Sequence, residues 1–284
     1  MRASNALYIY PGKDPDRQIQ DVKALHSSDP NGLHRFDQVK IYVDGILSQT
    51  TARTLTPYAV DLGLPLPGDT GFAYFDRERL YRYAREFSES GFSLHFHATG
   101  ELGVRAALDA IEQLPSGSGP HRITHVYRVH PADRERFGTL GVYADFQIAP
   151  SAQSMSYQRY IAKLLGERAP DLMPLTALHA AGAPITLSSD WDADELSPLV
   201  KLATVLTHHP RLPRKDVFDM MTVNGATLLR HADRTGSLEV GKAADLVIID
   251  GDLLNAPAAE IAGSAVRATL LQGQAVFDPD GLFE

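Results

Sequence analysis

The 284-residue sequence contains no cysteine. This absence excludes disulfides, cysteine-based zinc sites and a thiol nucleophile, so any transition metal must be held by His, Asp, Glu or Lys. Long apolar runs are also missing, because no segment approaches the ~20 residues that span a membrane. The first ten residues lack the apolar core of a signal peptide. We therefore expect a cytoplasmic protein.

Basic residues are in the minority, with 27 Lys and Arg against 35 Asp and Glu and a formal net charge of −8. This charge disfavours nucleic acid and anionic membranes as partners. A small-molecule substrate is expected instead, and association of identical copies is left open. Hydrophobic residues make up 44% of the chain, which is enough for one large buried core.

Short apolar runs alternate with longer amphipathic segments, as in βα units around a parallel sheet. The apolar spacing predicts helices over residues 78–90, 102–111, 171–181, 196–208 and 214–230. Six strands are expected, at Ala6–Tyr10, Gln38–Val43, Phe92–His97, Arg122–Val126, Val142–Gln147 and Pro184–Ser188.

A closed barrel of this kind needs eight βα units, so six leave it incomplete. Beyond the helices, the strings GSLEVGKAADLVIIDGD and VRATLLQGQAVF are typical of short strands between Gly turns. We predict an α/β fold: a TIM-like (β/α) barrel over residues 1–232 that lacks its first two units. A small β-strand appendage over residues 233–284 would form part of a composite β domain. The sheet should stay open between its first and sixth strands.

Two histidines, His95 and His97, stand in the string LHFHATGE. At i and i+2 on a strand they point to one side, and the strand ends where barrel active sites are built. The simpler alternative is a pair of histidines at a solvent-exposed edge. His125 ends another apolar strand, RITHV, and a lone His in such a place is more often structural.

Two further residues stand out. Asp190 follows a buried strand in TLSSDW, where an Asp can also serve as a simple turn or helix cap. Lys40 lies inside the apolar strand VKIYVDG, where its charge is costly unless it is paired or lost. Together with the histidines, these residues follow successive strands toward one common face. Imidazoles and oxygen donors suit zinc, so the pattern indicates hydrolysis by a metal-activated water.

Five strings resemble the YtcJ-like, or amidohydrolase-3, branch of the amidohydrolase superfamily over about residues 2–277. They are VKIYVDGILSQTTA, FHATGELGVRAALDAIE, RITHVYRVHPADRERFGTLGV, LSSDWD and GSLEVGKAADLVIID. The resemblance implies a distorted TIM barrel with one or two divalent metals, commonly zinc. Such a metal-dependent hydrolase acts on carbon–nitrogen (non-peptide) bonds such as amides.

The resemblance also implies roles for single residues. Lys40 would be a metal ligand, carboxylated in members with two metals, and His97 and His125 would be further ligands. Asp190 would be both a ligand and the general base. The residues expected beside the ligands or lining the pocket are His95, Asp44, Gln49, Trp191 and Asp192.

The sequence departs from the family by lacking the strand-one His-x-His motif, because its one HxH string is LHFH. Partial or single zinc occupancy is therefore expected. One hypothesis is a hydrolase whose first barrel units are missing from this chain. A second is a catalytically inactive fragment or binding module that holds at most one metal. A third, a structural or interaction protein, has no positive support in the sequence.

Overall fold

The computed structural model describes residues 2–27, 33–60, 63, 70–193 and 195–283. The chain divides into two compact units, Arg2–Phe146 with Ser154–Ile185, and Gln147–Gln153 with Thr186–Glu284. The domain boundary predicted between residues 232 and 233 stays a prediction. No helix of the described residues is long and apolar enough to cross a membrane.

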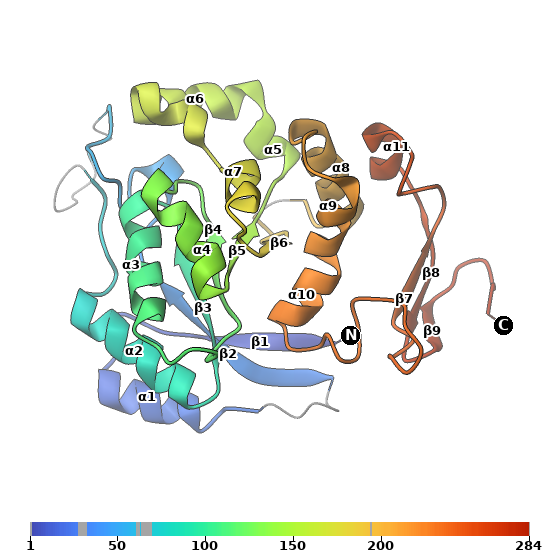
Figure 1. The fold of residues 1–284 in the computed structure, drawn as a ribbon, viewed down its shortest axis with the longest axis horizontal. Coiled ribbons are helices and arrows are strands. Elements are labelled where there is room, and N and C mark those ends of the chain that lie inside the picture. Colours follow the sequence, from blue (N-terminus) through green and yellow to red (C-terminus); the bar gives the residue numbers. More distant parts are fainter. Residues whose placement is uncertain (1, 28–32, 61–62, 64–69, 194, 284) are drawn as a thin grey trace. The chain divides into compact units, whose positions relative to one another are not determined.

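A six-stranded sheet in the order β1 to β6 is the main feature of the fold (Figure 1). Its neighbours from β1 to β5 are parallel. The strands are β1 Ala3–Tyr8, β2 His34–Tyr42, β3 Ser93–Ala98, β4 His121–His125, β5 Val142–Phe146 and β6 Ile185–Leu187. All six predicted strands are confirmed, although the first begins at Ala3 and not at Ala6. Since β1 and β6 are the two edges, the sheet is an incomplete α/β barrel, as predicted.

One face of the sheet is apolar and covered by helices. Ile41 of β2 and Phe96 of β3 are completely buried on it. Helix α2 (Arg77–Glu89) contacts β3, α3 (Glu101–Glu112) contacts β3 and β4, and α4 (Arg134–Leu140) contacts β5 (Figure 1). Helices α2 and α3 confirm the two helices predicted there. Side-chain alternation therefore gives the apolar positions to the helices and leaves the other face for polar groups.

Capping residues explain where the first helices begin. Asp14 accepts a hydrogen bond from Arg17 N at 2.9 Å at the start of α1 (Pro15–Lys23), whose first residue is proline. Asp76 accepts one from Arg79 N at 2.8 Å at the start of α2. A side-chain acceptor satisfies a backbone N–H that the first turn leaves free, and proline at the first position loses no bond.

A small second core lies in the same unit. Helix α6 (Met155–Leu165) packs on the loop that contains the 3-10 helix η1 (Leu47–Gln49), and the Tyr160 hydroxyl donates to Ser48 O at 2.6 Å. Its buried members are Leu47, Ala52, Tyr58, Ile161, Leu164 and Leu165. The remaining helical segments of this unit are η2 Pro131–Asp133, η3 Gly166–Asp171 and α7 Leu175–Ala180.

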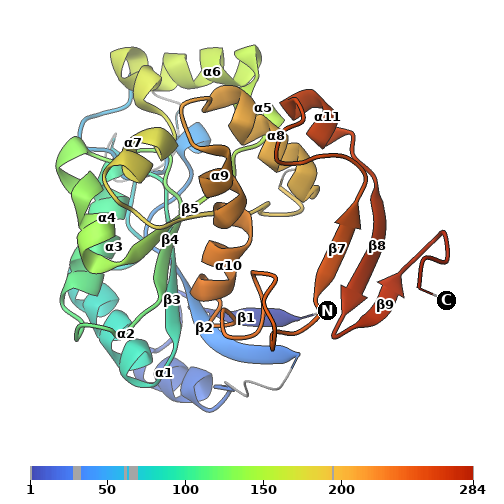
Figure 2. The ribbon, with the colours of Figure 1, turned by 45° about the vertical axis from the view of Figure 1, so that its right-hand side comes forward.

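The second unit combines short helices with an antiparallel sheet in the order β7-β8-β9 (Figure 2). The strands are β7 Leu246–Ile249, β8 Val266–Leu271 and β9 Gln274–Phe277. The helices are α5 Pro150–Gln153, α8 Pro198–His208, α9 Arg214–Met221, α10 Val223–Leu228 and α11 Ala258–Ala262. The predicted β appendage is thus confirmed as a separate small sheet.

The single helix predicted over residues 214–230 is wrong. The chain breaks at Thr222, which has φ −118° and ψ −87°, so α9 and α10 are separate. The Thr222 hydroxyl donates to Phe218 O at 2.8 Å, a back-bond that tends to bend helices. Gly236 also lies against the break, since a Cβ there would be 3.3 Å from Thr222 O. Tertiary packing therefore overrides the continuous apolar spacing.

We expect Phe96→Ala to lower the free energy of unfolding by about 3–5 kcal/mol, because its side chain is completely buried and truncation leaves a cavity. The matched control is Phe36→Ala in β2, whose side chain is 41% exposed. Urea denaturation followed by circular dichroism compares the two variants. Equal losses of stability would contradict the assigned core.

Candidate active site

Polar side chains occupy the sheet face opposite the helices. In the strand register Lys40 lies beside His95, and Tyr42 lies beside His97. The same rows continue into β4, where His95 is level with Arg122. These side chains lead toward the carboxyl ends of the strands, where barrel enzymes build their active sites.

His97 and His125 come together on this face. Their ring centroids are 4.5 Å apart, and both side chains are buried. Tyr42 stacks on His97 with centroids 4.1 Å apart and an interplanar angle of 17°. The structure thus brings together two of the predicted ligands and holds one ring in a fixed plane.

The hydrogen bonding of His97 leaves one nitrogen free. Its Nε2 lies 3.0 Å from Gly45 O, and because a carbonyl only accepts, Nε2 carries the hydrogen. Nδ1 is buried and has no hydrogen-bond partner among the residues that the structure describes. Burial lowers the pKa of His97 to about 4; the Gly45 bond opposes this shift and Lys40 adds to it. The ring is therefore neutral at pH 7, with an available lone pair on Nδ1.

The end of β4 has an unusual backbone. His125 has φ 79° and Val126 has φ 49°, in the left-handed region that β-branched residues rarely adopt. Hydrogen bonds fix this segment to the end of β3, from Val126 N to Ala98 O at 3.1 Å and from Arg128 N to Thr99 O at 2.9 Å. Strained backbone of this kind collects at functional sites and persists only when its surroundings hold it.

His95 is the centre of a polar network. Its Nδ1 lies 2.7 Å from the Arg122 guanidinium, which can only donate, so Nδ1 accepts. Nε2 lies 2.6 Å from Thr124 Oγ1 and 2.7 Å from Lys40 Nζ. Thr124 in turn donates to Asp145 Oδ2 at 3.2 Å. Burial first, and then Arg122 and Lys40, lower the pKa of His95 well below its ordinary value, so this ring is neutral too.

Lys40 therefore points to the polar face and not to the helices. Its side chain is partly buried, and Nζ lies 5.5 Å from the centroid of the Tyr42 ring as well as beside His95. These neighbours are polar or aromatic, so the Lys40 amine avoids the cost of burial among apolar side chains. The next residue of the strand, Ile41, points to the other face and is completely buried.

Asp44 is a completely buried carboxylate at the end of β2. It accepts hydrogen bonds at 2.9 Å from three backbone N–H groups, those of Arg53, Thr99 and Gly100. Burial raises its pKa from 3.8 to about 7, although these hydrogen bonds and the Arg53 charge oppose the shift. Asp44 thus shapes two loops, and its predicted place beside the metal ligands stays a prediction.

The other predicted residues lie in loops. Asp190 is exposed and has φ 52°, and its backbone carbonyl accepts a hydrogen bond from Ala193 N at 2.8 Å. Trp191 is 68% exposed and Asp192 is exposed as well. These three belong to the second compact unit. Gln49 is exposed at the end of η1, in the first unit. Their parts in the site stay predictions.

Several residues of the site were not singled out from the sequence. Arg122, Thr124 and Asp145 complete the network around His95, and a buried ion pair joins Arg128 Nε to Glu101 Oε1 at 3.0 Å. The sequence does place Arg122, Thr124 and Asp145 among polar residues that alternate with apolar ones along the strands. This alternation predicts that they lie on the polar face of the sheet, but it does not predict which side chains meet across neighbouring strands.

The first unit offers part of the ligand set that a metal ion needs. No group of three or more His, Asp or Glu side chains is gathered in the parts of the chain that the structure describes. His97 and His125 supply two adjacent imidazoles, and the buried Nδ1 of His97 lacks a partner. A neutral imidazole nitrogen without a hydrogen is the form that binds zinc, so this pair fits part of a metal site.

Solved structures share this fold. The chain superimposes with a TM-score of 0.73 on an uncharacterized metal-dependent hydrolase from Pyrococcus furiosus, at 24% identity over 90% of this chain and 52% of that one. A similar hydrolase from Pyrococcus horikoshii gives the same TM-score at 22% identity. The fold is thus that of the metal-dependent hydrolases. The Amidohydrolase family matches residues 15–277, and the chain belongs to it.

Curated relatives are distant. The chain is 24% identical over 257 residues to the putative amidohydrolase YtcJ of Bacillus subtilis, covering 86% of this chain and 47% of that protein. It is 23% identical over 226 residues to the N-substituted formamide deformylase of Arthrobacter pascens, covering 74% and 41%. A 5-methylthioadenosine/S-adenosylhomocysteine deaminase of Desulfovibrio desulfuricans is 26% identical over 221 residues, covering 70% and 44%. The chain spans less than half the length of each.

Replacing Asp44 by Asn should destabilise the fold. The carboxylate accepts three N–H groups on two oxygens, and an amide has one oxygen, so at least one buried N–H loses its acceptor. The expected loss is about 1–3 kcal/mol in the free energy of unfolding. Urea denaturation at pH 7 measures it, and an unchanged midpoint would show that the three hydrogen bonds do not hold the loops.

The stability of this variant should also lose a pH dependence. Because the folded pKa of Asp44 is raised to about 7 from 3.8, the folded protein keeps a proton that the unfolded chain has already lost between these values. Wild-type stability, relative to that of Asp44→Asn, should therefore fall as pH rises from about 4 to about 7, by about 1 kcal/mol per pH unit. Parallel curves for the two proteins would contradict the raised pKa.

Proposed function

We propose that this chain hydrolyses carbon–nitrogen bonds other than peptide bonds, using one or two divalent metal ions, zinc being the expected metal. Lys40, His97, His125 and Asp190 would hold the metal. The observation that carries the proposal is the free, buried Nδ1 of His97 beside the His125 ring, on the polar face of the sheet. Membership of the Amidohydrolase family supports the reaction class, and the names of the deformylase and the deaminase describe carbon–nitrogen cleavage.

The roles of the chain's residues follow from their surroundings. A divalent ion held there would supply a water of lowered pKa and polarise the substrate carbonyl. His97 keeps Nδ1 free of hydrogen because its Nε2–H donates to Gly45 O, and the Tyr42 ring fixes its plane. Lys40 Nζ lies 2.7 Å from His95 Nε2 on the same face. The Asp190 carboxylate would take the proton of the attacking water and pass it to the leaving nitrogen.

If the site holds two metal ions, we propose that Lys40 is carboxylated. Addition of CO₂ to the neutral amine, with release of one proton to the solvent, would give an anionic carbamate whose two oxygens are hard ligands for divalent metal ions. The contact of Lys40 with His95 and its electrostatic effect on His97 support this proposal. Mass measurement of the intact chain in bicarbonate buffer detects the added carboxylate.

A second candidate function is a non-catalytic protein that binds one metal ion. It is favoured by the lack, in the described residues, of a gathered group of three His, Asp or Glu side chains. Two imidazoles alone make a weak zinc site, because structural and catalytic zinc sites use three or four protein ligands. Zinc binding without hydrolysis would identify this function.

Loss of either imidazole should weaken zinc binding. His97→Ala and His125→Ala are each expected to lower the affinity for zinc at least about tenfold, since each removes a ligand. The matched control is His34→Ala, an exposed histidine at the start of β2. Isothermal titration with zinc measures binding, and an assay with N-substituted formamides and simple N-acyl amides measures hydrolysis. Unchanged zinc affinity in both variants would contradict the proposed site.

A further inference from the structure

A pocket of about 190 Å³ lies between the first halves of α2 and α3. Val43, Phe75 and Leu80 form its apolar floor, and each is at most 6% exposed. Val43 continues the alternation of Val39 and Ile41, the apolar side of the sheet that packs on the helices. The pocket is therefore on the helix side of the sheet, away from the face that carries His97 and His125.

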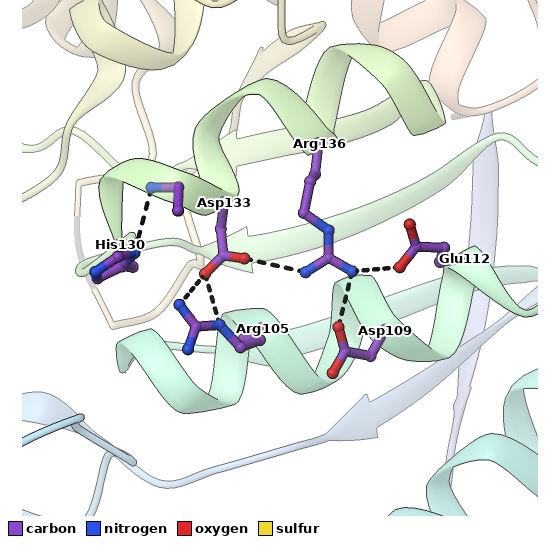
Figure 3. A network of polar contacts seen from close by, with 7 residues as sticks. Arg105, Asp109, Glu112, His130, Asp133 and Arg136 are labelled. Carbon is purple, nitrogen blue, oxygen red and sulfur yellow. Dashed lines mark hydrogen bonds and ion pairs between the residues drawn. The ribbon is translucent and has the colours of Figure 1, made fainter.

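Four charged side chains line this pocket. Two of them, Arg105 and Asp109, form ion pairs with residues of α4 and of the turn before it. Arg105 Nε and Nη2 both lie 2.9 Å from Asp133 Oδ2. Asp109 accepts a hydrogen bond from Arg136 at 2.7 Å (Figure 3). Arg136 also pairs with Asp133 and with Glu112, so Arg105 and Asp109 each have a partner of opposite charge within this network. Arg105 and Asp109 are thus already engaged in ion pairs with α4 and the turn before it.

The other two charged groups are Arg53 and Arg77. Within the described residues, neither guanidinium forms an ion pair. Arg77 Nε donates to the Tyr81 hydroxyl at 3.0 Å, and its guanidinium carbon lies 5.1 Å from the centre of that ring. Arg53 interacts electrostatically with Asp44, and Arg77 with Asp109, but in the part of the chain that the structure describes neither contact is close enough to be an ion pair. The pocket thus offers two positive groups beside a buried apolar floor.

We propose that this pocket binds a small organic carboxylate with an apolar body. The body would lie on Val43, Phe75 and Leu80, and the carboxylate would accept from Arg53 and Arg77. Guanidinium groups match carboxylates in geometry, and such charge-assisted bonds are stronger than neutral ones. The volume is below the 300–1,000 Å³ typical of sites for drug-sized ligands, so the ligand is the size of one ring with its carboxylate. This site is independent of the proposed hydrolysis.

Benzoate is the probe, and benzamide, which has the same shape without the charge, is its matched control. We expect saturable binding of benzoate in chemical-shift titrations, with shifts at the amides of Ala73, Leu102 and Ala106, which line the pocket. Benzamide should bind at least about tenfold more weakly, because it loses the charge-assisted hydrogen bonds. No saturable binding, or equal affinity for the two probes, would overturn the proposal.

Variants locate the site. Arg53→Gln and Arg77→Gln should each lower benzoate affinity about tenfold, while Arg85→Gln, an exposed position of α2 outside the pocket, should leave it unchanged. Ala106→Phe fills the pocket without a change of charge and should abolish binding. Thermal melting confirms that each variant is folded. Unchanged benzoate affinity in both Arg53→Gln and Arg77→Gln, in folded proteins, would overturn the assignment.

Discussion

Three backbone N–H groups converge on the buried carboxylate of Asp44, and the loops around the candidate site take their shape from this contact. The groups come from Arg53, in the loop after β2, and from Thr99 and Gly100, between β3 and α3. The same contact needs small neighbours. A Cβ on Gly103 would lie 2.3 Å from Asp44 Oδ2, and one on Gly100 would lie 2.1 Å from Arg53 O. The glycines of the string ATGELG are thus required by close packing.

The orientation of His97 depends on this arrangement. Gly45, the residue after Asp44, receives hydrogen bonds from His97 Nε2 and from the Thr99 hydroxyl. The carbonyl decides which nitrogen of His97 carries the hydrogen, and so which one is free. A buried structural carboxylate therefore controls, through one carbonyl group, the nitrogen on which the proposed metal site depends. The proposed metal site and the stability of these loops are thus coupled at this end of the sheet.

Sequence alternation predicted most of the sheet. The six strands of the sheet and the helices before and after β3 follow from apolar spacing, and the i, i+2 pair His95 and His97 correctly marked the polar face. The network around His95 could not be predicted in the same way, because Arg122, Thr124 and Asp145 reach it from strands that are distant in the sequence. The break at Thr222 was missed because apolar spacing continues through it, while the close approach of Gly236 is a tertiary contact. The roles of Lys40 and Asp190 came from family resemblance.

The proposed function requires a metal ion at His97 and His125. Anomalous diffraction at the zinc edge, from crystals of the chain grown with zinc, can locate such an ion. We expect an anomalous peak within bonding distance of His97 Nδ1 and of the His125 ring, with His97 Nε2 still donating to Gly45 O. Zinc bound only at other positions, with His97 Nδ1 hydrogen-bonded to water or to protein, would contradict it.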